Sequence, residues 1–434
     1  MRKSLLSGMM LILLSANLFA SGFQINENGA RAMGMANAFT GLANDASAVF
    51  FNPAGMTQLK GTNFSAGVSL IAPMTKFTGP NQAKDEYKLK SNVFTPFTLY
   101  ISHQLTDDIF VGLSVNNPYG LGTEWNSDWA GRYLAVDTEI RTFNFQPTIA
   151  YKFNEHFSIG FGFSIAYGDV KIKKNLPLAD PFTGAVSPDA SSLLEGDGTS
   201  FGFNIGFLWK PIDEFSLGVD YRSKNKYTFE GTATTNPPTF TITHPLAGPI
   251  PVKLPYGNVE APLTTPENLV IGLAYKPNKT LTIAADFQYV GWKSYDKLEV
   301  TFKDYVVNTS TGSKVSSSYR GFKNSYIARV GSEYLYSNEL ALRFGLLYDK
   351  NPVEDELVEP TLPDADRIGI TAGFGYKLTE CLSIDVSYFY LHFMEREITN
   401  SVNTTVPGKP SLGYFNGTYK PVAHLFAVSF NYTL

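Results

Sequence analysis

Positively charged residues set among apolar ones are the side chains of this sequence best placed to bind a ligand. Lys174 occupies an even position in a segment where large apolar residues fill the odd positions, so it shares a face with Gly160 and Ser164. Lys323 and Arg329 likewise fall on the face opposite their large apolar neighbours. A cation that faces an otherwise apolar space attracts a carboxylate through charge-assisted hydrogen bonds. The pattern therefore favours a ligand that carries a carboxylate.

Structural roles for the charged residues also remain open. Each of these cations could pair with an inward-facing carboxylate such as Glu333, or stand in water at one end of the fold. Asp364, Asp366 and Arg367 are suited to an ion pair at the start of a strand, because their spacing lacks the glycine and the terminal glutamate of a calcium-binding loop. We therefore expect no metal ion and no cofactor.

The residue types that commonly catalyse reactions do not occur here at the spacings of the catalytic motifs we considered. The sequence has 5 histidines, none of which belongs to a metal-binding motif, and no G-x-S-x-G motif marks a nucleophilic serine. We predict that the protein is not an enzyme. A lipase, whose serine and histidine come together only in the folded chain, is the minor alternative.

Strict alternation runs through the segments that must position these residues. Large apolar residues recur at every second position, which indicates β-strands with one apolar face. The opposite face is small and weakly polar, as expected for a transmembrane β-barrel with lipid outside and a filled lumen inside. The clearest examples are residues 157–168, 201–209, 368–378 and 426–434.

Composition and loop lengths agree with an all-β transmembrane barrel. Aromatic residues make up 14% of the chain and charged residues only 17%, and no segment after the N-terminus is apolar enough for a membrane-spanning helix. Short polar connections alternate with long ones, which we expect to be irregular extracellular loops at residues 175–198, 232–256, 304–320, 351–365 and 399–419. We predict an antiparallel barrel of about fourteen strands over residues 62–434, placed in a bacterial outer membrane.

The N-terminal part divides into two segments. Residues 1–20 have the basic start and the short apolar core of a secretory signal peptide. Residues 21–61 do not alternate and are too few to bury a core of their own, so we expect them to fill the lumen as a hatch. The net charge of −4 gives no basic footprint for a nucleic acid, and the 1 cysteine, Cys381, cannot form an internal disulfide.

Motifs along the whole mature chain resemble the FadL family of outer-membrane long-chain fatty-acid transporters, which includes relatives proposed to carry aromatic hydrocarbons. In chain order, they are Ser21-Gly22-Phe23-Gln24-Ile25-Asn26-Glu27, Asn52-Pro53-Ala54, Asn116-Asn117-Pro118-Tyr119-Gly120-Leu121 with Thr123-Glu124, Tyr221-Arg222-Ser223, Gly321-Phe322-Lys323, Pro363-Asp364-Ala365-Asp366-Arg367 and Phe430-Asn431-Tyr432. Two features depart from the family pattern. The chain ends in Leu434 rather than an aromatic residue, and the connection at 175–198 is short.

The resemblance implies a site as well as a fold. Members of the family capture a ligand outside, hold it in the lumen and release it sideways through a gap in the wall. On this resemblance, Phe23 and Lys174 contact the ligand, and Arg320 stands near a second basic contact that aligns with Ser318. The same likeness assigns Asn52, Pro53 and Ala54 to the hatch, adjoining the wall near a kinked third strand. It places the lateral opening at Asn117, Pro118, Gly120 and Gly122, where a proline and two glycines also weaken strand pairing.

The sequence thus predicts a passive outer-membrane channel for long-chain fatty acids or similar hydrophobic molecules. We expect a monomer surrounded by outer-membrane lipid and lipopolysaccharide. Two alternatives are an aromatic-hydrocarbon channel of the same family and a barrel that displays adhesion or receptor loops. A general porin fits less well, because an open aqueous pore needs a polar, charged lumen.

Overall fold

The computed structural model describes residues 22–80, 85–407 and 409–434. The expected signal peptide at residues 1–20 lies outside this part of the chain. Within it, no helix is long and apolar enough to cross a membrane.

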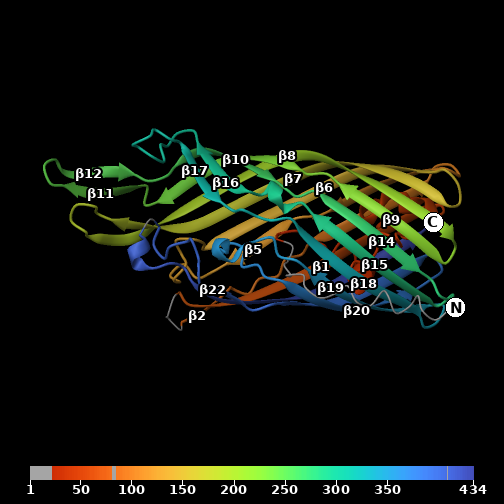
Figure 1. Cartoon of the computed structure of the whole chain (residues 1–434). Coiled ribbons are helices and arrows are strands. Elements are labelled where there is room, and N and C mark those ends of the chain that lie inside the picture. Colours follow the sequence, from red (N-terminus) through yellow and green to blue (C-terminus); the bar gives the residue numbers. More distant parts are fainter. Residues whose placement is uncertain (1–21, 81–84, 408) are drawn as a thin grey trace, which may run out of the picture.

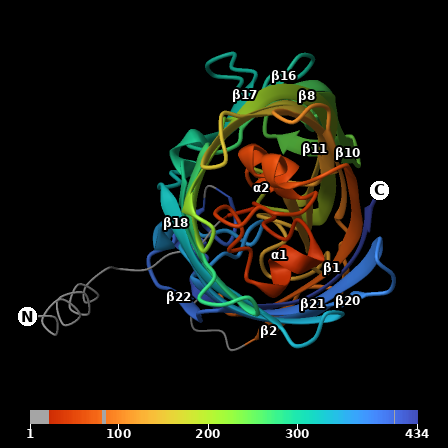
Figure 2. The same ribbon diagram turned by 90° about the vertical axis from the view of Figure 1, so that its right-hand side faces the viewer.

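The wall is a closed antiparallel sheet of 14 strands, which confirms the predicted barrel (Figures 1 and 2). β1 pairs with β3 on one side and with β23 on the other, so the sheet has no free edge where it closes. Seven of the 14 strands are interrupted, and each of these consists of two elements that follow one course: β3 with β2, β4 with β5, β9 with β10, β14 with β13, β15 with β16, β18 with β17, and β21 with β22.

The elements have the following bounds. The strands are β1 Thr62–Thr78, β2 Glu86–Lys88, β3 Phe97–Gln104, β4 Ile109–Asn116, β5 Gly120–Glu124, β6 Asp137–Lys152, β7 Phe157–Ala179, β8 Val186–Ile212, β9 Phe215–Arg222, β10 Lys226–Asn236, β11 Thr239–His244, β12 Gly248–Lys253, β13 Gly257–Thr264, β14 Asn268–Tyr275, β15 Leu281–Val290, β16 Lys297–Phe302, β17 Val315–Tyr319, β18 Ser325–Leu335, β19 Leu340–Asp349, β20 Arg367–Lys377, β21 Leu382–Phe393, β22 Arg396–Ile398 and β23 Gly417–Thr433. The helices are α1 Ala30–Gly34, α2 Ala48–Phe51, and the 3-10 turns η1 Pro53–Gln58, η2 Trp292–Ser294, η3 Asp355–Leu357 and η4 Pro410–Leu412.

The alternation seen in the sequence becomes an outer and an inner face. Large apolar side chains are exposed on the outside of strands around the wall, among them Leu70, Phe145, Phe161, Ile271 and Phe374. Their strand neighbours point inward, where they are small or polar and buried. Lipid takes the place of a protein core on the outer face.

The segment that precedes β1 lies inside the ring of strands, where Figure 2 shows α1 and α2. We call residues 22–61 the hatch segment. Its helix α1 packs against β20, β21 and β23, and η1 packs against β6, β7 and β8. Glycines of the wall make this close approach possible. A Cβ atom at Gly206 would lie 2.2 Å from the Asn52 Oδ1, and one at Gly345 would lie 2.5 Å from the Ala36 N.

Two connections differ from the irregular loops that the sequence led us to expect. At residues 175–198 the ladder between β7 and β8 continues far beyond the apolar belt, with Lys174 opposite Ser192. At residues 232–256 the hairpin of β11 and β12 extends the end of the molecule that lies opposite the C-terminus (Figure 1). Polar residues on both faces of these strands hide the alternation, because no lipid contacts them there.

Candidate functional site

Two neighbouring cavities adjoin the start of the hatch segment. The wall cavity, of about 610 Å³, lies beside β1, β5 and β6. The loop cavity, of about 480 Å³, lies among the extended ends of β7, β8, β13 and β16. Both are lined by Phe23, Leu121, Ile140 and Leu362, so these four side chains form the partition between them.

The wall cavity passes through the barrel wall. Its lining includes Ile140, which is buried and faces inward, and also Arg141 and Phe143, which face outward from the same strand. Side chains on both faces of one strand can line a single cavity only where the wall beside that strand is interrupted. The interruption lies between β4 and β5, where Asn117, Pro118 and Tyr119 leave the ladder.

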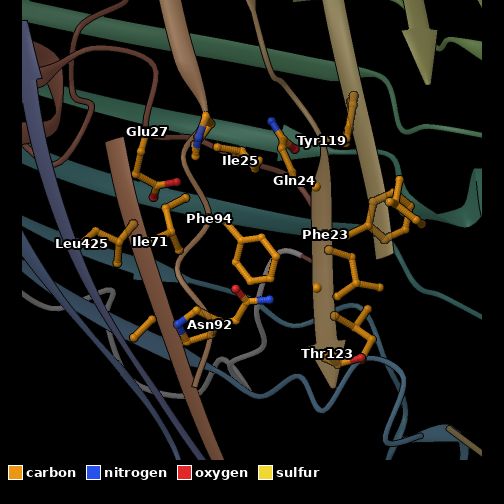
Figure 3. Close-up of a pocket in the computed structure, with 18 of the residues that line it drawn as sticks. Phe23, Gln24, Ile25, Glu27, Ile71, Asn92, Phe94, Tyr119, Thr123 and Leu425 are labelled. Carbon is orange, nitrogen blue, oxygen red and sulfur yellow. The ribbon is translucent and has the colours of Figure 1, made fainter. Parts of the chain in front are cut away.

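One edge of β5 pairs with β6, and the other edge faces a segment that joins β2 to β3. This segment, residues 89–96, is bonded to β1 through Ile71: the Ile71 N–H donates to the Phe94 carbonyl at 2.8 Å, and the Phe94 N–H donates to the Ile71 carbonyl at 2.9 Å. The Phe94 ring lies on Gly122, where a Cβ atom would be 1.9 Å from the ring. Phe94 therefore fills the gap in the wall (Figure 3).

The start of the hatch segment is bonded to the inner side of the same gap. The Gly120 N–H donates to the Phe23 carbonyl at 3.0 Å, and the Ile25 N–H donates to the Pro118 carbonyl at 2.9 Å. The Phe23 ring packs on Trp292, with 4.8 Å between ring centroids. These contacts let residues 23–25 take the place of a strand partner for the interrupted wall.

Buried charges fix the hatch segment at Gly22. The Gly22 N–H donates to Asp364 Oδ2 at 2.9 Å, and Arg367 donates to the Gly22 carbonyl at 3.2 Å. Burial raises the pKa of the Asp364 carboxyl, although Arg367 and the Gly22 N–H oppose this shift by favouring the carboxylate. Burial likewise raises the pKa of Glu27, which lies in the hatch segment near Arg367 and Arg329.

The loop cavity combines an apolar lining with four charged side chains, those of Lys174, Glu195, Arg320 and Glu359. Apolar residues such as Ile172, Leu194 and Phe302 supply most of its surface. Lys174 lines it and has no ion pair or hydrogen bond from its ammonium group to any described residue. Arg320 also lines it and forms an ion pair with Glu359, while the buried Arg320 Nε has no acceptor among the described residues.

The other cations that the sequence singled out lie away from both cavities. Lys323 is half-exposed and pairs with Glu354 at 3.3 Å, because residues 320–324 lie between two strands and do not follow strand alternation. Arg329 faces inward, but it lies beneath the hatch segment and donates to Asn26 Oδ1 at 3.1 Å. The structure therefore brings together Phe23, Lys174 and Arg320, and it separates Lys323 and Arg329 from them.

The hatch motif has a different neighbour from the one expected. Asn52 donates to the backbone carbonyls of Thr40 and Phe207 at 3.0 Å each, and its Oδ1 accepts from the Ala54 N–H at 3.1 Å. Pro53 packs on Gly160 and Gly206. The motif thus lies against β7 and β8, whereas residues 23–28 meet the interrupted strand. The reason is that the start of the hatch segment pairs with the edge that the interruption exposes.

Sequence reasoning missed Phe94 and Glu359. Phe94 stands in a polar connection with no alternation to mark it, and Glu359 meets Arg320 across 39 positions of sequence. No group of three or more potential metal ligands occurs in the part of the chain that the structure describes.

Comparison with known proteins identifies the family. Residues 11–434 match the family described as outer membrane protein transport protein (OMPP1/FadL/TodX). The chain belongs to this family. It is therefore an outer-membrane transport protein, as the sequence predicted, and the family is one of channels rather than enzymes.

Individual relatives resemble the chain over nearly its full length. The long-chain fatty acid transport protein of Escherichia coli O6:H1 is 27% identical, covering 97% of this chain and 96% of the relative. A Pseudomonas aeruginosa FadL homologue of known structure is 23% identical, with a TM-score of 0.80, covering 95% of this chain and 100% of that one. The P. putida toluene transporter TodX is 17% identical, with a TM-score of 0.71, covering 94% and 99%. At these identities, the two structures show a shared fold.

Proposed function

We propose that this protein is a passive channel that carries long-chain fatty acids across the outer membrane and releases them sideways into the bilayer. The observation that carries the proposal is the apolar path from the loop cavity, past the Phe23 partition, into a wall cavity that reaches the outer face of β6. The relative named a long-chain fatty acid transport protein supports this choice of ligand.

The path suits an acyl chain for a physical reason. Moving each methylene into water costs about 0.8 kcal/mol, so a long chain that left through an aqueous pore would meet a large barrier. A lateral exit keeps the chain in an apolar environment from the loop cavity to the membrane core. The carboxylate would stay at Lys174 and the Arg320 Nε until the chain advances.

A neutral aromatic hydrocarbon is the second candidate. Within the partition, Phe23 is surrounded by the rings of Trp292, Tyr295 and Tyr119, and such an aromatic cluster also accepts flat rings. The toluene transporter TodX has the same fold. The unpartnered Lys174 favours an acid over a hydrocarbon, because a buried cation gains little from a neutral ligand.

The third candidate is a barrel that displays receptor loops, for which the exposed tip of the β11–β12 hairpin would be the contact surface. Leu246 at that tip is 94% exposed. This role would leave the two internal cavities without a use.

We further propose that the barrel acts as a monomer in outer-membrane lipid and lipopolysaccharide, because its exposed apolar side chains extend around the wall.

The test is uptake of labelled oleate by cells that lack other fatty-acid transporters. We expect the protein to restore uptake. The variant with Pro118→Val and Gly120→Val should abolish uptake while purified protein still binds oleate, because a continuous strand would close the gap. Pro251→Val, a matched change in the exposed β12, should leave uptake unchanged. Normal uptake by an assembled variant whose gap is closed would contradict lateral exit. Uptake of labelled toluene without oleate would favour the second candidate.

A further inference from the structure

The charges that line the loop cavity are arranged around Arg320. Glu359 pairs with one edge of the Arg320 guanidinium, and both side chains are largely buried. The Nε on another edge of the same guanidinium is buried and has no acceptor among the described residues. A ligand oxygen could accept from this Nε while Glu359 keeps its place, since a guanidinium presents five N–H donors in a planar fork.

Glu359 is held in position independently of Arg320. The Leu362 N–H donates to the Glu359 carbonyl at 3.1 Å, and the Thr361 hydroxyl donates to Glu359 Oε2 at 3.3 Å. The next residue, Pro360, accepts from the Trp125 Nε1 at 3.0 Å. Glu359 is therefore a fixed negative charge of the cavity and not a side chain that swings in from solvent.

The resulting charge of the site is a single excess positive charge. Lys174 and Arg320 contribute two cations, and Glu359 contributes one anion. Arg320 and Glu359 both act electrostatically on Lys174. Glu195, the remaining charged residue of the lining, is exposed and faces Lys171 across the strand pair. Lys171 itself pairs with Asp137 at 2.6 Å, so water rather than Lys171 screens the charge of Glu195.

We propose that Glu359 is a specificity-determining residue, a built-in counter-ion that limits the loop cavity to ligands whose head group carries one negative charge. The inference rests on the proposed function and adds a head-group rule to it. A single carboxylate matches the excess charge and is shared by Lys174 and the Arg320 Nε. A head group with two carboxylates would place its second charge against Glu359, in a site where water cannot screen the repulsion.

The experiment compares two ligands with the same chain. Stearate carries one carboxylate, and hexadecylmalonate is the same molecule with a second carboxylate on the carbon next to the first. Their affinities are measured on the purified full-length barrel at about pH 8, where all of these carboxyls are ionised. The wild type should prefer stearate. Glu359→Gln should shift the ratio of the two affinities toward hexadecylmalonate by roughly tenfold or more, the size of effect that one charge-assisted hydrogen bond has on binding.

The ratio is insensitive to partial loss of binding, because both ligands bury the same chain. Glu195→Gln is the matched control, and it should change the ratio less than about twofold, since an exposed charge is screened. An unchanged ratio in Glu359→Gln, equal shifts in both variants, or a wild type without preference would each overturn the inference and leave the proposed function standing. Failure of the wild type to bind either ligand would instead reject the proposed function.

Discussion

At the scale of single residues, Lys174 is the side chain with the clearest role. It projects from β7 into an apolar cavity, and its ammonium group meets no acceptor in the described chain. Charge-assisted hydrogen bonds contribute about 1.5–3 kcal/mol, so Lys174→Ala should weaken oleate binding roughly tenfold or more. The neighbouring Lys173 lies on the outer face, and Lys173→Ala should leave the affinity unchanged. Equal affinities for the two variants, measured by titration of folded protein, would remove Lys174 from the site.

The carboxyl group of Asp366 makes the local stability of the chain depend on pH. Its desolvation in the loop before β20 raises the carboxyl pKa from 3.8 to about 6, while a hydrogen bond from the Tyr348 hydroxyl at 2.9 Å opposes the shift. Because the folded pKa is the higher one, the stability that this group contributes is complete below about pH 4 and is lost as the pH rises through about 6.

Hydrogen exchange can detect this loss. After correction for intrinsic rates, the amides of residues 364–367 should be better protected at about pH 4.5 than at about pH 7.5. Asp366→Asn removes the titrating group and should abolish the difference. A difference of the same size in the variant would show that another group is responsible.

At the scale of elements, the segment at residues 89–96 closes the gap in the wall beside β5. It is bonded to β1, and at its start the Lys90 N–H donates to the carbonyl of Glu124, the last residue of β5, at 2.8 Å. Farther along, Phe94 meets β5 only through side-chain contact on Gly122. Contacts of that kind break more easily than a ladder of backbone hydrogen bonds. We therefore expect the part of the segment around Phe94 to move away from β5 when an acyl chain passes.

A reversible crosslink tests that movement. In a Cys381→Ser background, which removes the exposed free cysteine, Phe94→Cys with Gly122→Cys can be joined by a short bifunctional methanethiosulfonate. Oleate uptake should fall to background on crosslinking and return after reduction. Val93, whose side chain is 54% exposed, supplies the control pair Val93→Cys with Gly122→Cys, which should crosslink poorly and keep its uptake. Full uptake by the crosslinked Phe94 pair would mean that the exit lies elsewhere.

Elements also show how far the sequence could be interpreted. The interruption of the third strand was predictable, because Pro118 has no N–H to give to a ladder. The continued pairing of β7 with β8 beyond the membrane was not, since polar residues on both faces carry no alternation. Lys323 was misplaced because parity applies only within a strand. The pairs Arg320–Glu359 and Phe94–Gly122 depend on tertiary contacts, for which a single sequence carries no signal.

At the scale of the whole molecule, ion pairs hold the hatch segment inside the barrel. Arg31 of α1 pairs with Glu333 of β18 at 2.9 Å, and Glu333 also accepts from Arg343 of β19 at 2.7 Å. Arg343 in turn pairs with Asp385 of β21 at 2.6 Å. The network thus links the hatch segment to three strands of the wall, near the end of the barrel that carries the C-terminus.

Removing the shared carboxylate should loosen this arrangement. Glu333→Gln leaves Arg31 and Arg343 close together without the anion between them, and breaking such a buried network costs about 3–5 kcal/mol. We expect a lower free energy of unfolding in denaturant and faster proteolysis within residues 22–61. Glu380→Gln, in an exposed turn at the same end, should behave as wild type. Unchanged proteolysis in Glu333→Gln would show that packing alone retains the hatch segment.

The close packing of the hatch segment on wall glycines has an electrical consequence. Ions cross a membrane protein through a continuous column of water, and side chains and backbone of residues 22–61 occupy the space where such a column would run. A planar bilayer containing many copies of this protein should therefore carry almost no ionic current under an applied voltage. A cell can then increase its capacity for apolar nutrients without increasing the leak of ions and small hydrophilic solutes, including antibiotics that enter through open pores.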